Sequence, residues 1–488
     1  MRRYLLENPG SGRGSKYLQV AHAIIADIQR GRLQPGDRLP STRDLAQTIG
    51  VHRKTVIAAY DELGRQGWVT AEAARFTKVS QELPRAAPGM AAHRAEERQR
   101  AGFELPPRLV PDAPPRRRGD ALLLLGGVPE LRFTKELSIA RAYGRSLRGP
   151  AGRRLLDYCD PQGDPRLRDA LAEVLGRTRA LRCSRASIAV VRGSQEALYL
   201  LARTLVREGD RIAVEALGYP QAWGAFRAVG ADLVPIPVDA QGLNVDKLAA
   251  AIRRQSVRAL YLTPHHQLPT TVTLSQERRA ELLALAARER FFIVEDDYDH
   301  EFQYDSNPVL PLASRDTEGL VIYVGTLSKT LAPGLRIGFV VGPRDVIDRI
   351  TSYRIFVDQQ GDHVVERTIA DLIEEGELER HIRHACRVYR SRRDVLAAAL
   401  RCQLPQLSFA VPGGGMAIWA KVAGTGVDVD AWARRGAAAG VAFQVASHFA
   451  VDRKPRPFLR LGFAACNEAE LKEATRRMAA TFDPSAGD

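Results

Sequence analysis

The sequence predicts three parts: a small helical domain, a linker rich in proline and arginine, and a large α/β domain. In residues 17–70, apolar side chains recur at helical spacing between short turn signals. From residue 119 onward, short β-branched runs alternate with helical stretches, a pattern typical of a mostly parallel sheet with helices on both faces. We therefore expect domains over residues 1–80 and 119–488, joined by a linker over residues 81–118.

The small domain is predicted to hold three helices and a hairpin. A helix that ends before Gly31 is followed by one over residues 41–49, with Ser41 as its N-cap. A tight turn leads to a third helix over residues 52–66, and a hairpin over Val69–Val79 would form a wing. Two helices joined by a short turn predict a helix-turn-helix, whose second helix enters the major groove of DNA.

Hydrogen-bond donors and cations gather at the start of the third helix, where base edges and phosphates would lie. The net charge of +14 and the pI of about 9.8 also favour nucleic acid as a partner. A small helical bundle with a solvated basic face is the alternative, and the "PPRRR" run of the linker is open to the same two interpretations. The side chains expected to contact double-stranded DNA are Arg38, Ser41, Arg43, His52, Arg53, Lys54 and Thr55.

Seven short runs in the large domain have the length and composition of strands. Long helices around residues 364–400 then lead into a final mixed segment. The strand-like runs are "SIAVVRG", "DRIAVEA", "ADLVPIPV", "VRALYLTP", "FFIVEDDY", "GLVIYVG" and "IGFVVG", with helical stretches between them.

Composition argues against several classes of protein. The five cysteines are scattered and no pair has CxxC spacing, so they indicate neither a disulfide framework nor a zinc site. The apolar run Ala121–Val128 is far shorter than the ~20 residues that span a bilayer. The N-terminal residues lack the sustained apolar segment of a secretory signal. We expect a cytoplasmic protein with no membrane partner.

The stretch "GTLSKTLAPGLRIGF", residues 325–339, places one lysine in a turn rich in small hydroxyl residues. Lys329 follows the apolar run "LVIYVG", so a short loop can hold its amine in a pocket, and Thr326, Ser328 and Arg336 can donate to a phosphate. A lysine amine and phosphate donors are two requirements of pyridoxal 5'-phosphate (PLP), which attaches to lysine as a Schiff base. A surface lysine beside serines is the plainer interpretation.

The third requirement of PLP is an acid against its pyridine nitrogen, and the apolar strand in "FFIVEDDYDHEF" ends in such acids. Buried carboxylates need partners, and a pyridinium would be one for Asp296, while Tyr298 could donate to the phenolic oxygen. Two alternatives stay open from the residues alone: a solvated acidic loop, or a metal site formed by Glu295, Asp296, Asp297 and Asp299.

Three further strand ends carry suitable side chains. In "VVRGSQEALYLLAR", Ser194 and Gln195 begin a helix after a glycine turn, and backbone N–H groups at a helix N-terminus bind phosphate. Tyr219 in "EALGYP" is placed to stack on a ring. Gln267 lies in "LTPHHQLPT", after another strand.

The run "GRLQPGDRLPSTRDLAQTIGVHRKTVIAAYDELGRQGWV" resembles the winged-helix domain of the GntR family of bacterial transcription regulators, over about residues 15–80. The lysine, acid and glycine-turn stretches, with "LDYCDPQGDPRLRDALAEVL", resemble the fold-type-I aminotransferases. Joined, they resemble the MocR/GabR subfamily of GntR regulators, from about residue 15 to 475. The resemblance implies a winged helix-turn-helix joined by a linker to a homodimeric PLP-binding domain of the aminotransferase fold.

The resemblance also implies roles for single residues. Lys329 would carry the Schiff base, Asp296 would face the pyridine nitrogen, and Arg460 in "FLRLGFA" would bind the carboxylate of an amino-compound effector. Tyr158 would reach the cofactor of the partner subunit. The remaining cofactor contacts would come from Tyr298, Tyr219, Ser194, Gln195, Gln267, Thr326, Ser328 and Arg336.

This sequence departs from the family pattern at three places. Ala216 and Leu217 stand where Asp-Pro usually precedes the stacking tyrosine, His265 stands for the serine of Ser-His-Gln, and Thr271 stands for the glycine of Pro-Thr-Gly. These changes reshape the expected effector pocket, so no particular ligand is carried over.

The resemblance implies a transcription regulator that senses an amino compound as an external aldimine, or that senses PLP itself. Transaminase activity would then be weak or vestigial. The alternative is a catalytically active aminotransferase that carries a DNA-binding domain, because the catalytic groups look complete.

Overall fold

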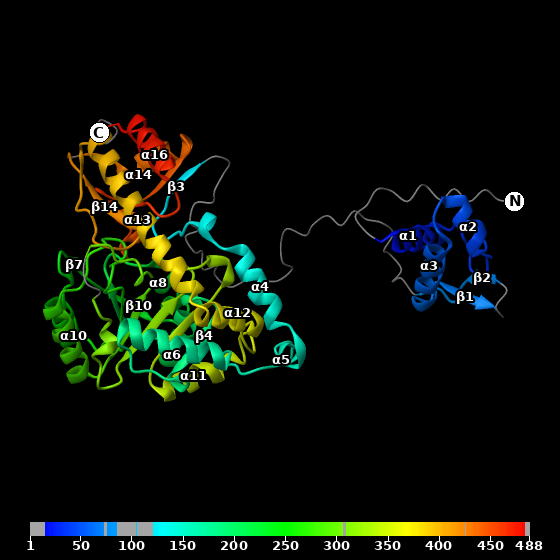
Figure 1. Cartoon of the computed structure of the whole chain (residues 1–488), viewed down its shortest axis with the longest axis horizontal. Helices are drawn as coiled ribbons and strands as arrows, with labels where there is room; N and C mark the ends of the chain where they lie inside the picture. Colours follow the sequence, from blue (N-terminus) through cyan, green and yellow to red (C-terminus); the bar gives the residue numbers. More distant parts are fainter. Residues whose placement is uncertain are drawn as a thin grey trace. The chain divides into compact units, whose positions relative to one another are not determined.

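The computed structural model describes residues 15–72, 76–84, 104, 121–305, 309–424 and 426–483. The chain divides into two compact units, Met1–Arg108 and Leu109–Asp488, which we call the head and the body (Figure 1). Most of the predicted linker, residues 85–103 and 105–118, lies outside the described residues. Among the helices of the described ranges, none combines the length and the apolar character needed to cross a membrane.

The head contains the predicted three helices and hairpin (Figure 1). The two strands pair antiparallel, with Val69 opposite Val79, and residues 73–75 between them lie outside the described part. A core of aliphatic side chains from every element holds the unit together, which includes Val20, Ile24, Leu45, Val56, Leu63 and Val79. The elements are α1 (Lys16–Gln29), α2 (Thr42–Ile49), α3 (Arg53–Arg65), β1 (Val69–Glu72) and β2 (Phe76–Val79).

The body is built on a seven-stranded sheet, and each of its strands is one of the seven predicted runs. All neighbouring pairs are parallel except those of β12, which runs antiparallel to both of its neighbours. The order across the sheet is β4 (Ile188–Val191), β12 (Gly338–Val341), β11 (Val321–Thr326), β10 (Phe292–Asp297), β9 (Ala259–Leu262), β5 (Arg211–Glu215) and β6 (Asp232–Ile236).

Helices cover both faces of this sheet, as the sequence predicts (Figure 1). Side chains alternate along each strand, so Val294 of β10 packs on one face and Ile293 on the other. One face carries α7 (Ser194–Leu205), α8 (Pro220–Arg227) and α11 (Arg344–Arg354). The other carries α4 (Glu136–Ser146), α6 (Pro165–Arg179), α9 (Val245–Arg254), α10 (Gln276–Glu289) and α12 (His363–Glu374).

A second sheet of five strands lies in the remaining part of the body, and four of its strands fall within the final segment that was predicted only as mixed. Its strands are β13 (Leu407–Ser408), β14 (Ala417–Val422), β16 (Phe458–Gly462), β15 (Val441–Val445) and β3 (Leu122–Leu124), in that order. Its core is shared with α13 (Glu377–Gln403), α14 (Val429–Ala438) and α16 (Glu468–Ala480). Shorter elements are α5 (Gly149–Arg154), α15 (Ala446–Phe449) and the pair β7 (Val238–Asp239) and β8 (Gly242–Leu243).

Candidate functional site

Two side chains predicted to contact DNA also cap helices of the head. At the start of α2, Ser41 Oγ accepts a hydrogen bond from the Asp44 amide at 3.2 Å. At the start of α3, His52 Nδ1 accepts one from the Lys54 amide, also at 3.2 Å. Each cap satisfies a backbone donor that the helix itself leaves without a partner. Both side chains therefore cap a helix, a role that was predicted for Ser41 alone.

The predicted DNA-contacting cations lie at the surface of the head. Arg38, Arg43, Arg53 and Lys54 are exposed, and Thr55 is half-buried. Arg53 Nε donates to Thr42 Oγ1 at 3.3 Å, which links the start of α3 to α2. The Arg38 guanidinium lies 3.7 Å from the ring centre of Phe76 on the hairpin, a cation–π contact. The predicted contacts thus come from both the helix-turn-helix and the segment beside the wing.

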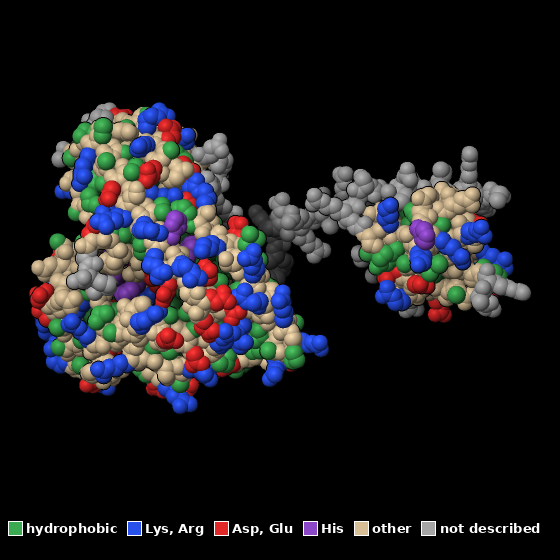
Figure 2. All heavy atoms as spheres, viewed as in Figure 1, with side chains coloured by type: hydrophobic (Ala, Val, Ile, Leu, Met, Phe, Trp, Pro, Cys, Tyr) green, Lys and Arg blue, Asp and Glu red, His purple; other side chains and the backbone are tan. Residues whose placement is uncertain are grey.

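Charge is distributed differently over the body. In Figure 2, side chains of both signs are interspersed over its visible face, and many form ion pairs. A surface of paired charges has no strong field of one sign in this view. The net charge of the chain therefore gives no separate support for a DNA contact by that face.

Asp296 lies near the end of β10 and is only 4% exposed. Its Oδ2 accepts a hydrogen bond from the Tyr261 hydroxyl at 2.8 Å. Burial raises the pKa of Asp296 to about 7, although the nearby Lys329 amine favours the charged form. A carboxylate in such surroundings gains from a further cationic partner.

Lys329 lies in the turn that follows β11, and Thr326 ends that strand. Burial lowers the pKa of Lys329 from its usual value, against the attraction of the carboxylates of Asp296 and Asp299. A lowered pKa keeps more of the amine neutral, and the neutral amine is the nucleophile that condenses with an aldehyde.

A cradle for an anion surrounds the N-terminus of α7. Gly193 precedes the helix with φ of +84°, and a Cβ there would lie 2.8 Å from Arg336 Nη2, so a side chain would collide with the guanidinium. Arg336 Nη2 donates to the Arg192 carbonyl at 2.6 Å, which fixes that guanidinium beside Ser194. The free N–H groups of the helix start and the guanidinium together favour a phosphate.

Two other predicted phosphate contacts, Thr326 and Gln195, form hydrogen bonds with backbone groups of the protein. The Thr326 hydroxyl accepts from the Ser328 amide at 3.1 Å and donates to the Ile337 carbonyl at 3.4 Å. Gln195 Nε2 donates to the Gln221 carbonyl at 3.0 Å. Thr326 therefore shapes the turn that presents Ser328, in addition to any contact with a ligand.

The segment after β9 joins the cofactor residues to Arg460. Tyr298 donates to the His266 carbonyl at 2.9 Å, and the fully buried Arg460 donates through Nη1 to the Pro269 carbonyl at 2.8 Å. Gln267 donates to the Leu217 carbonyl at 2.7 Å, and its Oε1 accepts from Thr270. Through these bonds, the Gln267 side chain holds the segment after β9 in place.

The two remaining tyrosines lie in contrasting environments. Tyr219 is the N-cap residue of α8, and burial raises its pKa to about 12, with Asp296 and Arg336 both close enough to act on it. Tyr158 is 81% exposed. Tyr219 is thus placed with the cofactor residues, whereas Tyr158 is not brought to the site of its own chain.

Two features of the site were missed from the sequence. Tyr261, which bonds Asp296, lies in an apolar strand where a tyrosine is readily taken for core packing. Gly126 passes so close to Arg460 that a Cβ there would lie 2.2 Å from the Arg460 Nε atom. The paired glycines after the apolar run at Ala121 were the available signal for the second feature.

The four acids of the alternative metal site do not converge on one point, because they bond separate partners. Glu295 accepts from the Leu312 and Ala313 amides at 2.8 and 2.9 Å, and Asp299 contacts His266 at 2.8 Å. Asp296 is bonded to Tyr261 on the opposite face of β10 from Glu295. The acids are also buried, so the solvated-loop alternative does not hold either.

Four buried side-chain atoms at the site lack a hydrogen-bond partner within the described ranges: Asp296 Oδ1, Ser328 Oγ, Gln195 Oε1 and Arg460 Nε. Buried polar atoms without partners are costly, which suggests that a ligand supplies them. A carboxylate oxygen suits a pyridinium N–H, a hydroxyl suits a phosphate, and a guanidinium N–H suits a carboxylate. The residues therefore fit PLP together with a ligand that carries a carboxylate.

Comparison with known proteins identifies both units. The model of the aminotransferase class I and II family matches residues 138–478, and that of the bacterial regulatory proteins of the gntR family matches residues 16–79. Kynurenine aminotransferase of Pyrococcus horikoshii, solved with PMP, substrates and products, has a TM-score of 0.70 and 31% identity over 74% of this chain and 91% of its own.

Two regulators are similar over nearly the whole chain. The probable rhizopine catabolism regulatory protein MocR of Rhizobium meliloti is 32% identical over 470 residues, which cover 95% of this chain and 93% of MocR. The HTH-type transcriptional regulator TauR of Rhodobacter capsulatus is 30% identical over 485 residues, 96% of this chain and 97% of TauR. With both family models matched in one chain and these regulators similar from end to end, the chain belongs to the MocR/GabR subfamily of GntR-family transcription regulators.

Proposed function

We propose that this chain is a PLP-dependent transcription regulator, in which the body binds an amino compound and the head binds an operator. The observation that carries the proposal is a half-buried lysine beside a buried carboxylate, with unmatched polar atoms around them, in the same chain as an exposed, basic helix-turn-helix. The first arrangement suits PLP and the second suits DNA.

Each part of the cofactor would meet a different group of residues. Lys329 would provide the amine, Asp296 the partner of the ring nitrogen, and Ser194, Ser328 and Arg336 the phosphate contacts. When bound, PLP supplies an aldehyde that condenses with amines and a ring that withdraws electrons. Arg460 would orient an amino compound through its carboxylate.

Exposed apolar side chains support a homodimer. Leu156, Tyr158 and Phe356 are 71%, 81% and 84% exposed, and Gln360 bonds to the Cys159 amide and links their two segments. Such a patch is unusual on a monomer and typical of an interface. In a dimer, Tyr158 would reach the partner's site, and two heads would meet two operator half-sites. Binding to an operator would place the protein in the cytoplasm.

A single substitution tests the cofactor assignment. The full-length Lys329→Ala variant should lose the visible absorbance of lysine-bound PLP and still bind DNA measurably at low salt, because the DNA contacts lie in the head. Lys421→Ala, which changes an exposed lysine of β14, should keep both properties. Unchanged absorbance in Lys329→Ala would refute the assignment.

A working aminotransferase is the second candidate, because Lys329, Asp296 and Arg460 are all present and an enzyme is among the similar structures. Wild-type protein can be mixed with a panel of amines and amino acids and its spectrum followed. A spectral change that persists without keto acid release supports a regulator that senses amines. Catalytic release of keto acid supports an enzyme, and DNA affinity that responds to PLP alone supports sensing of PLP itself.

A further inference from the structure

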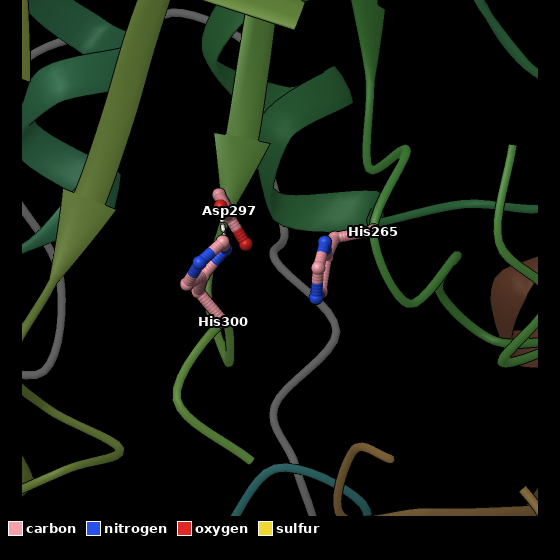
Figure 3. Close-up of side chains that lie close together, drawn as sticks. All are labelled: His265, Asp297 and His300. Atoms are coloured by element: carbon pink, nitrogen blue, oxygen red, sulfur yellow. Dashed lines mark hydrogen bonds and ion pairs between the residues drawn. The ribbon is translucent and has the colours of Figure 1, made fainter. Parts of the chain in front are cut away.

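Two histidines and one carboxylate form a cluster apart from the proposed cofactor contacts. His265 follows β9, Asp297 ends β10, and His300 lies in the turn after it. Because β9 and β10 are neighbouring parallel strands, their carboxyl ends meet at one edge of the sheet. One ring nitrogen from each histidine and a carboxylate oxygen all lie within 4.8 Å of one another. Figure 3 shows the His300 ring beside Asp297 and the His265 ring on the neighbouring segment.

Hydrogen bonds account for only part of this arrangement. His300 Nδ1 lies 2.8 Å from Asp297 Oδ2, and the Tyr323 hydroxyl donates to the same oxygen at 2.8 Å. His265 Nδ1 and Asp297 Oδ1, however, are buried and have no partner among the described residues. A purely structural network would leave this nitrogen and this oxygen without partners. That is unfavourable because His265 and Asp297 are each only 3% exposed.

We propose that His265, Asp297 and His300 bind a divalent transition-metal ion of the zinc class. Two imidazoles and a carboxylate form a donor set that Zn²⁺ accepts, with a fourth position for water or another ligand. In a tetrahedral site with bonds of about 2.0 Å, neighbouring ligand atoms lie about 3.3 Å apart. The ligand atoms of the cluster lie within 4.8 Å of one another, and small side-chain movements would shorten these distances to about 3.3 Å.

The surroundings of the cluster hold the ligands in suitable orientations. The Gln303 side-chain amide lies against His265 Nε2. With the amide turned so that its oxygen accepts from the Nε2–H, the ring leaves Nδ1 for the ion. The bond from Tyr323 orients the Asp297 carboxylate. For Nδ1 of His300 to coordinate, this ring must carry its single proton on Nε2, which frees Nδ1 for the ion.

Charge and access are also suitable. The neighbouring Arg179 donates to Glu301 and to the Tyr323 hydroxyl, so its positive charge is already paired. Against the effect of burial, His300 and Arg179 also hold the pKa of Asp297 below its usual value, so this carboxylate is charged and available to an ion. A cavity of about 280 Å³ lined by His300, Gln303 and Arg179 adjoins the cluster and offers an entry path.

The site is tested by metal analysis of the full-length protein after removal of any affinity tag. Chelator-treated protein is dialysed against Zn²⁺, and bound zinc is measured by elemental analysis. We expect about one ion per chain in wild type, and at least tenfold weaker binding in His265→Gln and His300→Gln. His381→Gln, which changes a buried histidine of α13, should bind as wild type does. The amount of zinc bound by the cofactor or by surface groups should be the same in wild type and in the three variants, so it cancels in the comparison.

Equal zinc binding by wild type and the two ligand variants would overturn the proposal. If the variants fail to fold, wild-type protein decides the matter alone, with Co²⁺ as the probe. A visible Co²⁺ spectrum typical of four-coordinate geometry, lost on adding one equivalent of Zn²⁺, would support the site. A spectrum of six-coordinate, solvent-like Co²⁺ would overturn it.

Discussion

Replacing Glu215 by glutamine should make the body more stable, and the gain should grow with pH. Glu215 ends β5 at 1% exposure, and burial raises its pKa to about 7, even though the Thr263 amide and hydroxyl donate to it at 3.1 and 3.0 Å. Because the folded pKa lies above the unfolded value of about 4.3, the folded state holds this proton more tightly. Stability from this group is therefore full at low pH and is lost as pH rises from about 4 to about 7.

The size of the effect follows from linkage. Each pKa unit corresponds to about 1.4 kcal/mol, so between pH 5 and pH 8 the wild-type body should lose about 2–3 kcal/mol through Glu215. Glutamine has no such proton to lose, and its amide oxygen can accept the same two bonds. The difference in unfolding free energy between the variant and wild type should therefore shift by that amount in favour of Glu215→Gln.

Urea denaturation of cofactor-free protein at pH 5, 6, 7 and 8 measures this shift. Other buried acids, such as Glu295, are present in both proteins and cancel in the comparison. Asp452→Asn serves as the matched control: this exposed carboxyl has a pKa lowered to about 2 by its bond with Arg456, so its effect should not change over this range. A Glu215→Gln difference that is constant with pH would refute the reasoning.

Two further substitutions test the head and the loop after β9, whose Pro269 carbonyl accepts a bond from Arg460. Arg53→Ala should weaken DNA binding at moderate salt by about 1–3 kcal/mol if this side chain reads a base, whereas Arg65→Ala, at the other end of α3, should bind as wild type does in the same anisotropy titration. Thr271→Gly should raise the unfolding free energy by about 1 kcal/mol, because the backbone of Thr271 has φ of +63°, a conformation that costs a β-branched residue about 1–2 kcal/mol. A wild-type affinity for Arg53→Ala, or a destabilised Thr271→Gly in thermal melts, would contradict these assignments.

The large sheet was predictable because its strands are buried on both faces. Strands such as β4 and β9 read as continuous apolar runs, which stand out against the helices between them. The second sheet was not, because its pairing is non-local: Leu122 of β3 lies opposite Val441 of β15. A three-residue strand with a partner more than 300 residues away leaves no local signal of that pairing.

The sequence indicates candidate site residues where the chemistry of a cofactor requires a residue type. It does not indicate the hydrogen-bond partners of a side chain that has several to choose from. Lys329 and Asp296 are residue types that the cofactor demands, and in the structure Asp296 is buried and Lys329 half-buried beside it. Gln267 stays a predicted cofactor contact, and in the structure its amide bonds the Leu217 carbonyl and the Thr270 amide, partners that the sequence does not indicate. Hydrogen-bond partners of this kind depend on loop geometry, which the sequence does not reveal.

The acids of β10 show how neighbours in sequence can serve different chemistry. Because side chains alternate across a strand, Asp296 points to the face of α7 and α8, whereas Glu295 and Asp297 point to the other face. Asp296 has the environment for a cofactor, Glu295 accepts two backbone amides, and Asp297 meets two histidines. In the sequence they look like one acidic cluster, and that likeness produced the four-carboxylate metal alternative. The metal site proposed here instead takes one acid from the strand and recruits His265, a position where this chain departs from the family pattern.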